Sequence, residues 1–310
     1  MRCSTLIVLT ASAVFLLLQS LVVGLIPAQV LMVGLFLLLF FAHAATRRLA
    51  VALLPFVVFE VCYDWMRLYP NYMVNPVDVR GIYEAEVSLF GITAHDGTPQ
   101  TLCDFFHTHH WAVVDLLTGL SYLCWVPGPM AVGLWLYFTG QRRAYLHFVI
   151  SFLVVNWLGF AIYYIHPAAP PWYVIEHGFE AIVGTGGSAA GLARFDEMVG
   201  LPVFQSIYVN NSNIFAAIPS LHAAYMLVAT IYAARAHCAH RSPLSSAIVV
   251  LCLLVTAGIW FTAVYSCHHY VIDVLLGIAT AIAGVCLFEF VLMRCQPVKR
   301  FIDTYERYIT

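Results

Sequence analysis

Long apolar stretches separated by short polar breaks run through most of the chain. A helix needs roughly 20 mostly apolar residues to cross a membrane, and about eight stretches fit that requirement. They run over residues 4–24, 28–46, 49–67, 111–139, 143–166, 216–236, 244–265 and 270–293. The two long polar stretches, 68–110 and 167–215, are rich in Gly, Pro, Asn and acidic residues and predict loops with short helices. The pattern therefore predicts an all-α, polytopic membrane protein.

The composition supports lipid as the solvent for most side chains. Hydrophobic residues make up 62% of the 310 residues and charged residues only 10%, whereas soluble domains carry about 25% charged residues. The first stretch is long enough to span and no small-residue cleavage site follows it, so it is predicted to be an anchor. We expect a two-span anchor over 1–48, a membrane domain over 49–293 with the two loops outside, and a tail over 294–310.

The basic residues predict the orientation of this domain. Lys and Arg gather on the cytoplasmic side of membrane proteins. With eight spans and a cytoplasmic N-terminus, only three of the fourteen, Arg67, Arg80 and Arg194, fall outside. The other eleven are Arg2, Arg47, Arg48, Arg142, Arg143, Arg235, Arg241, Arg294, Lys299, Arg300 and Arg307. Both termini are therefore predicted to be cytoplasmic, and both long loops periplasmic or lumenal.

Three polar segments fall at the same outer level of this topology. They cover residues 166–173, 218–223 and 265–273, at the outer ends of the fifth, sixth and eighth predicted spans. Ionisable groups at membrane depth are expensive and are commonly functional. We therefore expect these segments, far apart in the sequence, to form one site.

A histidine pair and a carboxylate in these segments have the properties of a phosphoryl-transfer site. His269 and Asp273 are four residues apart, which puts them on one face of a helix. A carboxylate beside an imidazole fixes its tautomer and stabilises its cationic form, as a nucleophilic histidine requires. His222, from another helix, can protonate a leaving oxygen and then take a proton from an incoming hydroxyl. Pro219 suits the first turn of that helix, whose free N–H groups can hold a phosphate.

These residues carry a resemblance to a known family. The segment 219–222 (Pro-Ser-Leu-His) and the segment 269–273 (His-Tyr-Val-Ile-Asp) resemble the second and third signature motifs of the type 2 phosphatidic acid phosphatase superfamily. Leu221 in place of the usual Gly, Ala-Pro-Pro-Trp-Tyr and His-His-Tyr-x-x-Asp resemble its inositol phosphorylceramide synthase branch. The resemblance extends over most of residues 60–293.

The resemblance implies a six-helix phosphatase-like core and a metal-free mechanism without a cofactor. In that family one histidine attacks phosphorus and a second is the acid and base, which gives His269 as nucleophile, Asp273 as its orienting partner and His222 as general acid and base. The synthase branch moves phosphoinositol from phosphatidylinositol to a ceramide through a phosphohistidine. The implied partners are thus phosphatidylinositol and ceramide-like lipids, not nucleic acid, in a bacterial inner membrane or an internal eukaryotic membrane.

The usual phosphate-clamping cations of the superfamily are missing. Its Lys-x6-Arg-Pro motif would place the Lys on Gly159 and the Arg on His166, and its Ser-Arg-x5-His motif would place an Arg on Ala263. A phosphoryl transition state still needs positive or hydrogen-bonding partners. The loss favours a synthase over a phosphatase. The substrate-binding candidates are His166, His268, Ser220, Arg194, His110 and Asp115.

Other interpretations of the function and of single residues stand beside this one. The protein can be a lipid phosphate phosphatase, in which water replaces the lipid hydroxyl, or a lipid transporter or binder without turnover. The run His107, His109 and His110 can hold a metal, although a polar loop end is the favoured interpretation. The nine cysteines predict no disulfide framework or zinc site, while Cys103 and Cys267 can pair.

Two acidic residues in the third predicted span also have two interpretations. Glu60 and Asp64 lie one helical turn apart, with Arg67 nearby. An ion pair near the membrane interface is the simpler interpretation. A contact with a lipid head group is the alternative.

Overall fold

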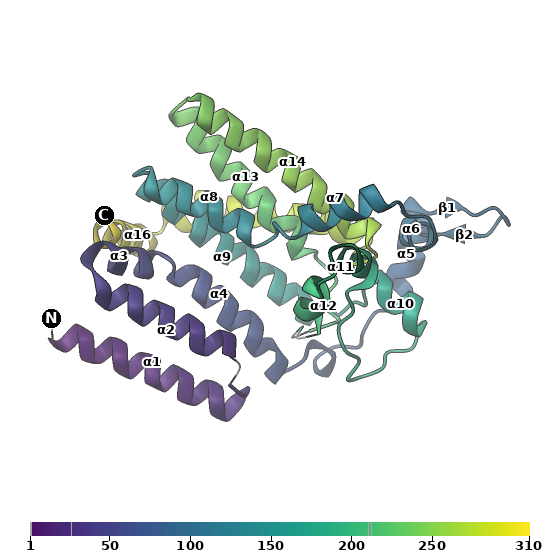
Figure 1. Cartoon of the computed structure of the whole chain (residues 1–310), viewed down its shortest axis with the longest axis horizontal. Helices are drawn as coiled ribbons and strands as arrows, with labels where there is room; N and C mark the ends of the chain where they lie inside the picture. The colour runs from purple at the N-terminus through teal and green to yellow at the C-terminus, as the bar shows by residue number, and fades with distance from the viewer. Residues whose placement is uncertain (1, 26, 210, 212) are drawn as a thin grey trace.

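The computed structural model describes residues 2–25, 27–209, 211 and 213–310. The long helices run roughly side by side, with both termini at one end of the molecule (Figure 1). The short helices and the hairpin lie at the other end. This arrangement separates a bundle of long helices from a layer of connecting segments.

All eight predicted spans are helical, so the all-α prediction is confirmed. Within the described residues, four segments are long and apolar enough to cross a membrane, and six are if each bent pair counts as one span. The four lie in α1 (Arg2–Val22), α9 (Arg142–Ile165), α14 (Pro243–Tyr265) and Val271–Arg294, which comprises α15 (Val271–Cys286), the π-helix Leu287–Val291 and the 3-10 turn Leu292–Arg294. The chain is a multi-pass membrane protein.

Two predicted spans are each broken into two helices at a proline. The bent pairs are α3 (Ala44–Ala52) with α4 (Leu54–Trp65), at 42°, and α7 (Ala112–Tyr122) with α8 (Pro127–Phe138), at 45°. Pro55 and Pro127 lie in the first turn of the second helix of each pair. Proline has no backbone N–H and clashes with the preceding turn, so it fits a helix start and not a helix interior.

The remaining two predicted spans are shorter or more polar. They are α2 (Pro27–Ala42), with 16 residues, and α13 (Leu221–Ala239), with 19 residues that include two histidines and Arg235. Helix α13 nevertheless lies in the middle of the bundle, where it packs against α8, α9, α14 and α15. Its first turn therefore lies among several helices at the end of the bundle that carries the loops.

The two predicted outer loops contain short helices, as expected, and one small hairpin. Their elements are the 3-10 turns Met66–Leu68, Asn71–Met73 and Ala190–Leu192, α5 (Arg80–Phe90), β1 (Ile92–Thr93) paired antiparallel with β2 (Pro99–Gln100), α6 (Leu102–Thr108), α10 (Pro171–His177), α11 (Ala193–Val199) and α12 (Val203–Tyr208). The loops are joined, since Asp78 N–H donates to the Pro167 carbonyl at 2.8 Å and Ala169 N–H donates to the Asp78 carbonyl at 3.0 Å.

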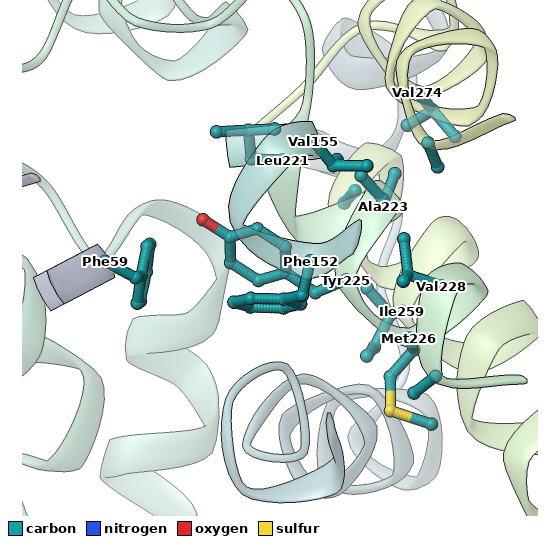
Figure 2. Close-up of a cluster of buried hydrophobic side chains, with 14 of the residues drawn as sticks. Phe59, Phe152, Val155, Leu221, Ala223, Tyr225, Met226, Val228, Ile259 and Val274 are labelled. Carbon is teal, nitrogen blue, oxygen red and sulfur yellow. The ribbon is translucent and has the colours of Figure 1, made fainter. Parts of the chain in front are cut away.

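An aromatic cluster joins α4, α9 and α13 in the middle of the bundle (Figure 2). The rings of Phe152 and Tyr225 have centroids 4.8 Å apart, and Phe59 meets Tyr225 edge-on at 5.6 Å. Such pairs stabilise a core beyond the area that they bury. The Tyr225 hydroxyl also donates to Asn156 Oδ1 at 2.7 Å. Helix α13 is thereby fixed one turn after His222.

The predicted tail forms an amphipathic helix, α16 (Gln296–Ile309). Ile302 and Ile309 are fully buried, and the Tyr305 hydroxyl donates to the Val51 carbonyl at 2.6 Å. Arg143 pairs with Asp303 at 2.8 Å. The C-terminal residues are therefore packed against the bundle at the end opposite the short helices.

Candidate active site

The structure brings the predicted histidine pair together from two helix starts. His222 lies in the first turn of α13, and His269 lies two residues before α15. Nδ1 of His222 is 3.3 Å from Nε2 of His269. At this distance the two imidazole rings are in direct polar contact, so both can reach one substrate group that binds beside them.

A close crossing of α13 and α15 creates this contact. The Ser220 N–H donates to the Asp273 carbonyl at 2.9 Å. A Cβ at Gly277 would lie 2.1 Å from the Ser220 carbonyl oxygen, so only glycine fits there. Ser220 is buried and its hydroxyl accepts from the Ala223 N–H, which caps α13. Ser220, a predicted substrate-binding residue, is thus a helix cap beside the site.

Asp273 lies close to His269, but the two residues do not share one face of a helix, as the sequence predicted. Helix α15 begins at Val271, so His269 precedes it, and Asp273 Oδ2 accepts from the Tyr270 N–H at 2.9 Å. The same oxygen lies 3.4 Å from His269 Nδ1, within ion-pair reach but without hydrogen-bond geometry. Asp273 is fully buried. It can therefore both cap α15 and orient His269, with Nε2 facing His222.

Glu86 completes this support and was not predicted from the sequence. It is fully buried on α5, and its two carboxylate oxygens accept from the N–H groups of Val271 and Ile272 at 2.9 and 3.1 Å. Burial raises the pKa of Glu86, and the two N–H groups oppose that rise. A carboxylate at a helix start also interacts favourably with the helix dipole. No local pattern signals this role, because the partners are 185 and 186 residues away.

Two aromatic residues near the break between α7 and α8 surround His222 and were also missed. The Tyr122 hydroxyl lies 2.9 Å from His222 Nδ1. The Trp125 ring meets the His222 ring edge-on at 4.6 Å. Since Tyr122 is fully buried, its hydroxyl can fix the His222 ring in the orientation that faces His269.

His268 faces the same cavity as the histidine pair. Its ring lies 4.4 Å from the Tyr208 ring and 5.7 Å from the Tyr122 ring. The side chain is buried, and both ring nitrogens lack a hydrogen-bond partner among the described residues. A buried, unpaired polar atom is costly. His268 is therefore able to hydrogen-bond to a ligand in this cavity.

The other predicted substrate-binding residues lie elsewhere. His166 pairs with Asp78 at 3.4 Å and its side chain is 47% exposed. Arg194 and Asp115 form an ion pair at 2.6 Å, and His110 lies 3.7 Å from the same carboxylate. None of these four lines the cavity that contains the histidine pair.

The cavity next to the histidines extends down the bundle. Its volume is about 570 Å³. Its walls come from α4, from the break between α7 and α8, and from the segments around His222 and His269. Its lining residues include Glu60, Asp64, Arg67, Trp125, His222, Tyr225, His268 and His269. A cavity of this kind suits an amphipathic ligand with a polar end at the histidines.

The structure also shows the surroundings of the residues considered above for a metal site and for a disulfide. His109 stacks on Phe105, with ring centroids 4.3 Å apart. Among residues 2–25, 27–209, 211 and 213–310, no group of three His, Cys, Asp or Glu side chains can hold a metal ion. Cys103 and Cys267 are buried neighbours as free thiols, with Cys267 Sγ donating to the Cys103 carbonyl at 3.3 Å.

Comparison with known proteins finds one family model and several related proteins that are similar to this chain. A family model described as PAP2 superfamily matches residues 97–287. A protein of Bacteroides thetaiotaomicron named phosphoinositol dihydroceramide synthase is 53% identical over 305 residues, which cover 98% of each chain. No solved structure matches the chain significantly.

More distant similarity extends to fungal proteins. The inositol phosphorylceramide synthase of Candida albicans is 26% identical over 76% of this chain and 48% of its own length. The inositol phosphorylceramide synthase catalytic subunit AUR1 of Saccharomyces cerevisiae is 27% identical over 85% of this chain and 61% of its own length. The chain thus spans only part of these fungal relatives, from 48% to 61% of their length.

Proposed function

Because the chain belongs to the PAP2 superfamily, we propose that it transfers phosphoinositol from phosphatidylinositol to the primary hydroxyl of a ceramide-type lipid. The names of the bacterial and fungal relatives support the phosphoinositol group and the ceramide-type acceptor. The observation that carries the proposal is the meeting of His222 and His269, 3.3 Å apart, with Asp273 behind His269 at the end of a membrane-depth cavity.

The first step forms a phosphohistidine. Nε2 of His269 attacks the phosphorus of the donor lipid, and the bond from phosphorus to the diacylglycerol oxygen breaks. His222 gives a proton to that oxygen, and diacylglycerol leaves. Asp273, 3.4 Å from Nδ1, stabilises the positive charge that develops on the His269 ring.

The second step transfers the group to the acceptor. His222 takes the proton of the ceramide hydroxyl, whose oxygen attacks phosphorus while the bond to His269 Nε2 breaks. Both histidines return to their starting states, so the catalytic cycle is closed. The phosphoryl oxygens need donors, and the unpaired ring nitrogens of His268 and the guanidinium of Arg67 line the same cavity. We propose that these two residues bind the phosphoryl oxygens in place of the Lys and Arg side chains that are missing from this chain.

The charge distribution supports one orientation of the protein in the membrane. We propose that both termini are cytoplasmic and that the histidine pair acts at the periplasmic or lumenal face. Residues 1–48 serve as a two-span anchor and residues 49–293 as the catalytic domain. Transfer on the outer face requires that the donor lipid be present in the outer leaflet.

The direct test is turnover by the purified protein. In detergent micelles with phosphatidylinositol and ceramide, it should form inositol phosphorylceramide and equal amounts of diacylglycerol, measured by mass spectrometry. His269→Ala should abolish both products, whereas His109→Ala, outside the cavity, should not. Release of inositol phosphate without an acceptor would instead indicate a phosphatase. Full activity of His269→Ala would refute the assigned nucleophile.

A further inference from the structure

The C-terminal helix α16 lies at the end of the bundle opposite the histidine pair (Figure 1). It begins two residues after Arg294, the last residue of a candidate span. From there it reaches α3, where the Tyr305 hydroxyl donates to the Val51 carbonyl. It also reaches α8, where the Tyr137 hydroxyl donates to the Ile309 carbonyl at 3.4 Å. Because α16 joins the ends of several long helices, it crosses the end of the bundle and runs roughly parallel to the membrane plane.

The protein itself occupies two sides of α16. Ile302 and Ile309, seven residues apart, are fully buried against the bundle. On the next side, the carboxylates of Asp303 and Glu306 pair with Arg143 at the start of α9, at 2.8 and 3.0 Å. Both acidic residues of the helix are thereby neutralised by an arginine of the bundle.

A third side of α16 carries two aromatic rings that the protein leaves half uncovered. Phe301 and Tyr308 are also seven residues apart, which puts them on one side of the helix. They are 54% and 50% exposed. Aromatic side chains gather at membrane–water interfaces, and a helix that lies in the interface turns such residues toward the lipid. Since α16 starts where a span ends, the surface of the bilayer is at the right level to cover both rings.

Unpaired basic residues accompany these rings. Arg294, Lys299 and Arg300 are exposed, and their side chains form no ion pair or hydrogen bond with any other residue that the structure describes. By contrast, Arg143 and Arg235, at the same end of the bundle, are held by carboxylates. Because the acidic residues of α16 are already neutralised, its exposed sides carry an excess of positive charge. Such a cluster beside a membrane attracts anionic lipid head groups.

We propose that α16 is an interfacial helix that binds anionic phospholipid head groups at the membrane surface opposite the histidine pair. Phe301 and Tyr308 enter the head-group region, and Arg294, Lys299 and Arg300 bind the lipid phosphates. This surface is separate from the proposed transfer site, and it does not depend on which side of the membrane the histidines occupy.

Lipid binding at this surface should stabilise the whole bundle. Helix α16 packs against α3, α9 and the end of the last candidate span, so a lipid that holds α16 opposes the separation of these helices. A ligand that binds only the folded protein stabilises it, and more so as the ligand concentration rises above its Kd. The stability of the membrane domain is therefore coupled to the anionic lipid content of the membrane.

The test measures lipid binding to the full-length protein in detergent by native mass spectrometry. The probes are phosphatidylglycerol, which is anionic and carries no inositol, and phosphatidylcholine, which is zwitterionic. The variants are Arg300→Gln and the triple variant Arg294→Gln, Lys299→Gln, Arg300→Gln. The matched control is Arg241→Gln, which removes another exposed arginine at the same end, in the turn between α13 and α14.

The wild type should bind phosphatidylglycerol roughly tenfold more tightly than phosphatidylcholine, or better. Arg300→Gln should weaken phosphatidylglycerol binding roughly fivefold, and the triple variant roughly a hundredfold, because each basic residue near an anionic surface contributes about a factor of five. Phosphatidylcholine binding should change little. Arg241→Gln should keep the wild-type affinity for both lipids.

A second measurement locates the helix in the bilayer. Phe301→Trp adds one indole, whose fluorescence in lipid nanodiscs is obtained as the difference from the wild type. Phospholipids brominated near the start of their acyl chains should quench this added fluorescence, because a side chain in the head-group region lies next to those positions.

Three outcomes would overturn the inference. The first is wild-type protein that binds the two lipids equally well, a result that needs no variant to fold. The second is a triple variant that loses no more affinity for phosphatidylglycerol than Arg241→Gln does. The third is added Phe301→Trp fluorescence that brominated lipids leave unquenched. Because none of these measurements uses turnover, they test the surface whether or not the proposed transfer reaction is correct.

Discussion

Glu86 offers a quantitative test of how the site is held together. Its two carboxylate oxygens accept from Val271 and Ile272 at 2.9 and 3.1 Å, directly after the His269 loop. A hydrogen bond to a charged group contributes about 1.5–3 kcal/mol. Glu86→Ala removes both and leaves two part-buried N–H groups without an acceptor, a loss of at most about 3–6 kcal/mol from the first turn of α15. Glu86→Gln keeps one acceptor and costs about half as much.

The loss should be visible in catalysis, because the first turn of α15 fixes the backbone of His269. Since about 1.4 kcal/mol corresponds to a tenfold change in rate, we expect Glu86→Gln to lower kcat/KM by roughly tenfold to a hundredfold. The effect should fall on kcat rather than on KM, because a displaced nucleophile affects the transition state and leaves the lipid contacts intact. The assay is the rate of diacylglycerol release in micelles, together with the melting temperature in detergent.

The control and the refuting result follow from the same helix. Glu84 lies two residues away on α5, with its side chain 65% exposed and a long 3.8 Å contact to Arg80. Glu84→Gln should behave like the wild type. If Glu86→Ala retained activity within about twofold of Glu84→Gln, less than 1 kcal/mol, the carboxylate would not hold the nucleophile, and the positioning argument would be wrong.

Three further predictions concern the surroundings of the histidine pair. His222→Ala should block transfer from phosphatidylinositol, but an aryl ester of phosphoinositol, whose leaving group needs no proton, should still form the phosphohistidine, detected by mass spectrometry. An aryl ester that leaves the protein unmodified would contradict the acid role. Tyr122→Phe removes one hydrogen bond to His222 and should lower kcat by up to about tenfold; an unchanged kcat would show that this contact does not orient the ring. Asp115→Asn leaves the half-buried Arg194 without its ion pair. It should cost at most about 3–5 kcal/mol of stability, seen as a lower melting temperature, while KM for both lipids stays near the wild-type value. A large change in KM with an unchanged melting temperature would return Arg194 and Asp115 to the substrate site.

The sequence predicts the helices well because local patterns specify them. The length of each apolar stretch predicts the membrane-spanning segments. Pro55 and Pro127, where two of these segments bend, are visible in the sequence, but each lies within one continuous apolar stretch, so the bend itself is not predicted. The prediction that the three polar segments lie on the same side of the membrane also follows from the order of the spans alone. Whether His222 meets His269, 47 residues away, does not, because that contact needs the close crossing at Gly277.

By itself, the sequence determined the helical membrane fold, the residues of the histidine pair and the carboxylate that accompanies them, since motif spacing and hydrophobicity are properties of short segments. Only the tertiary structure decided which side chains support them. It placed Glu86 under the start of α15 and Tyr122 beside His222, and it put His166 and Arg194 in ion pairs away from the cavity. The physical reason is that a buried polar group takes whichever partner the packed helices bring within hydrogen-bond distance, and sequence separation sets no limit on that partner.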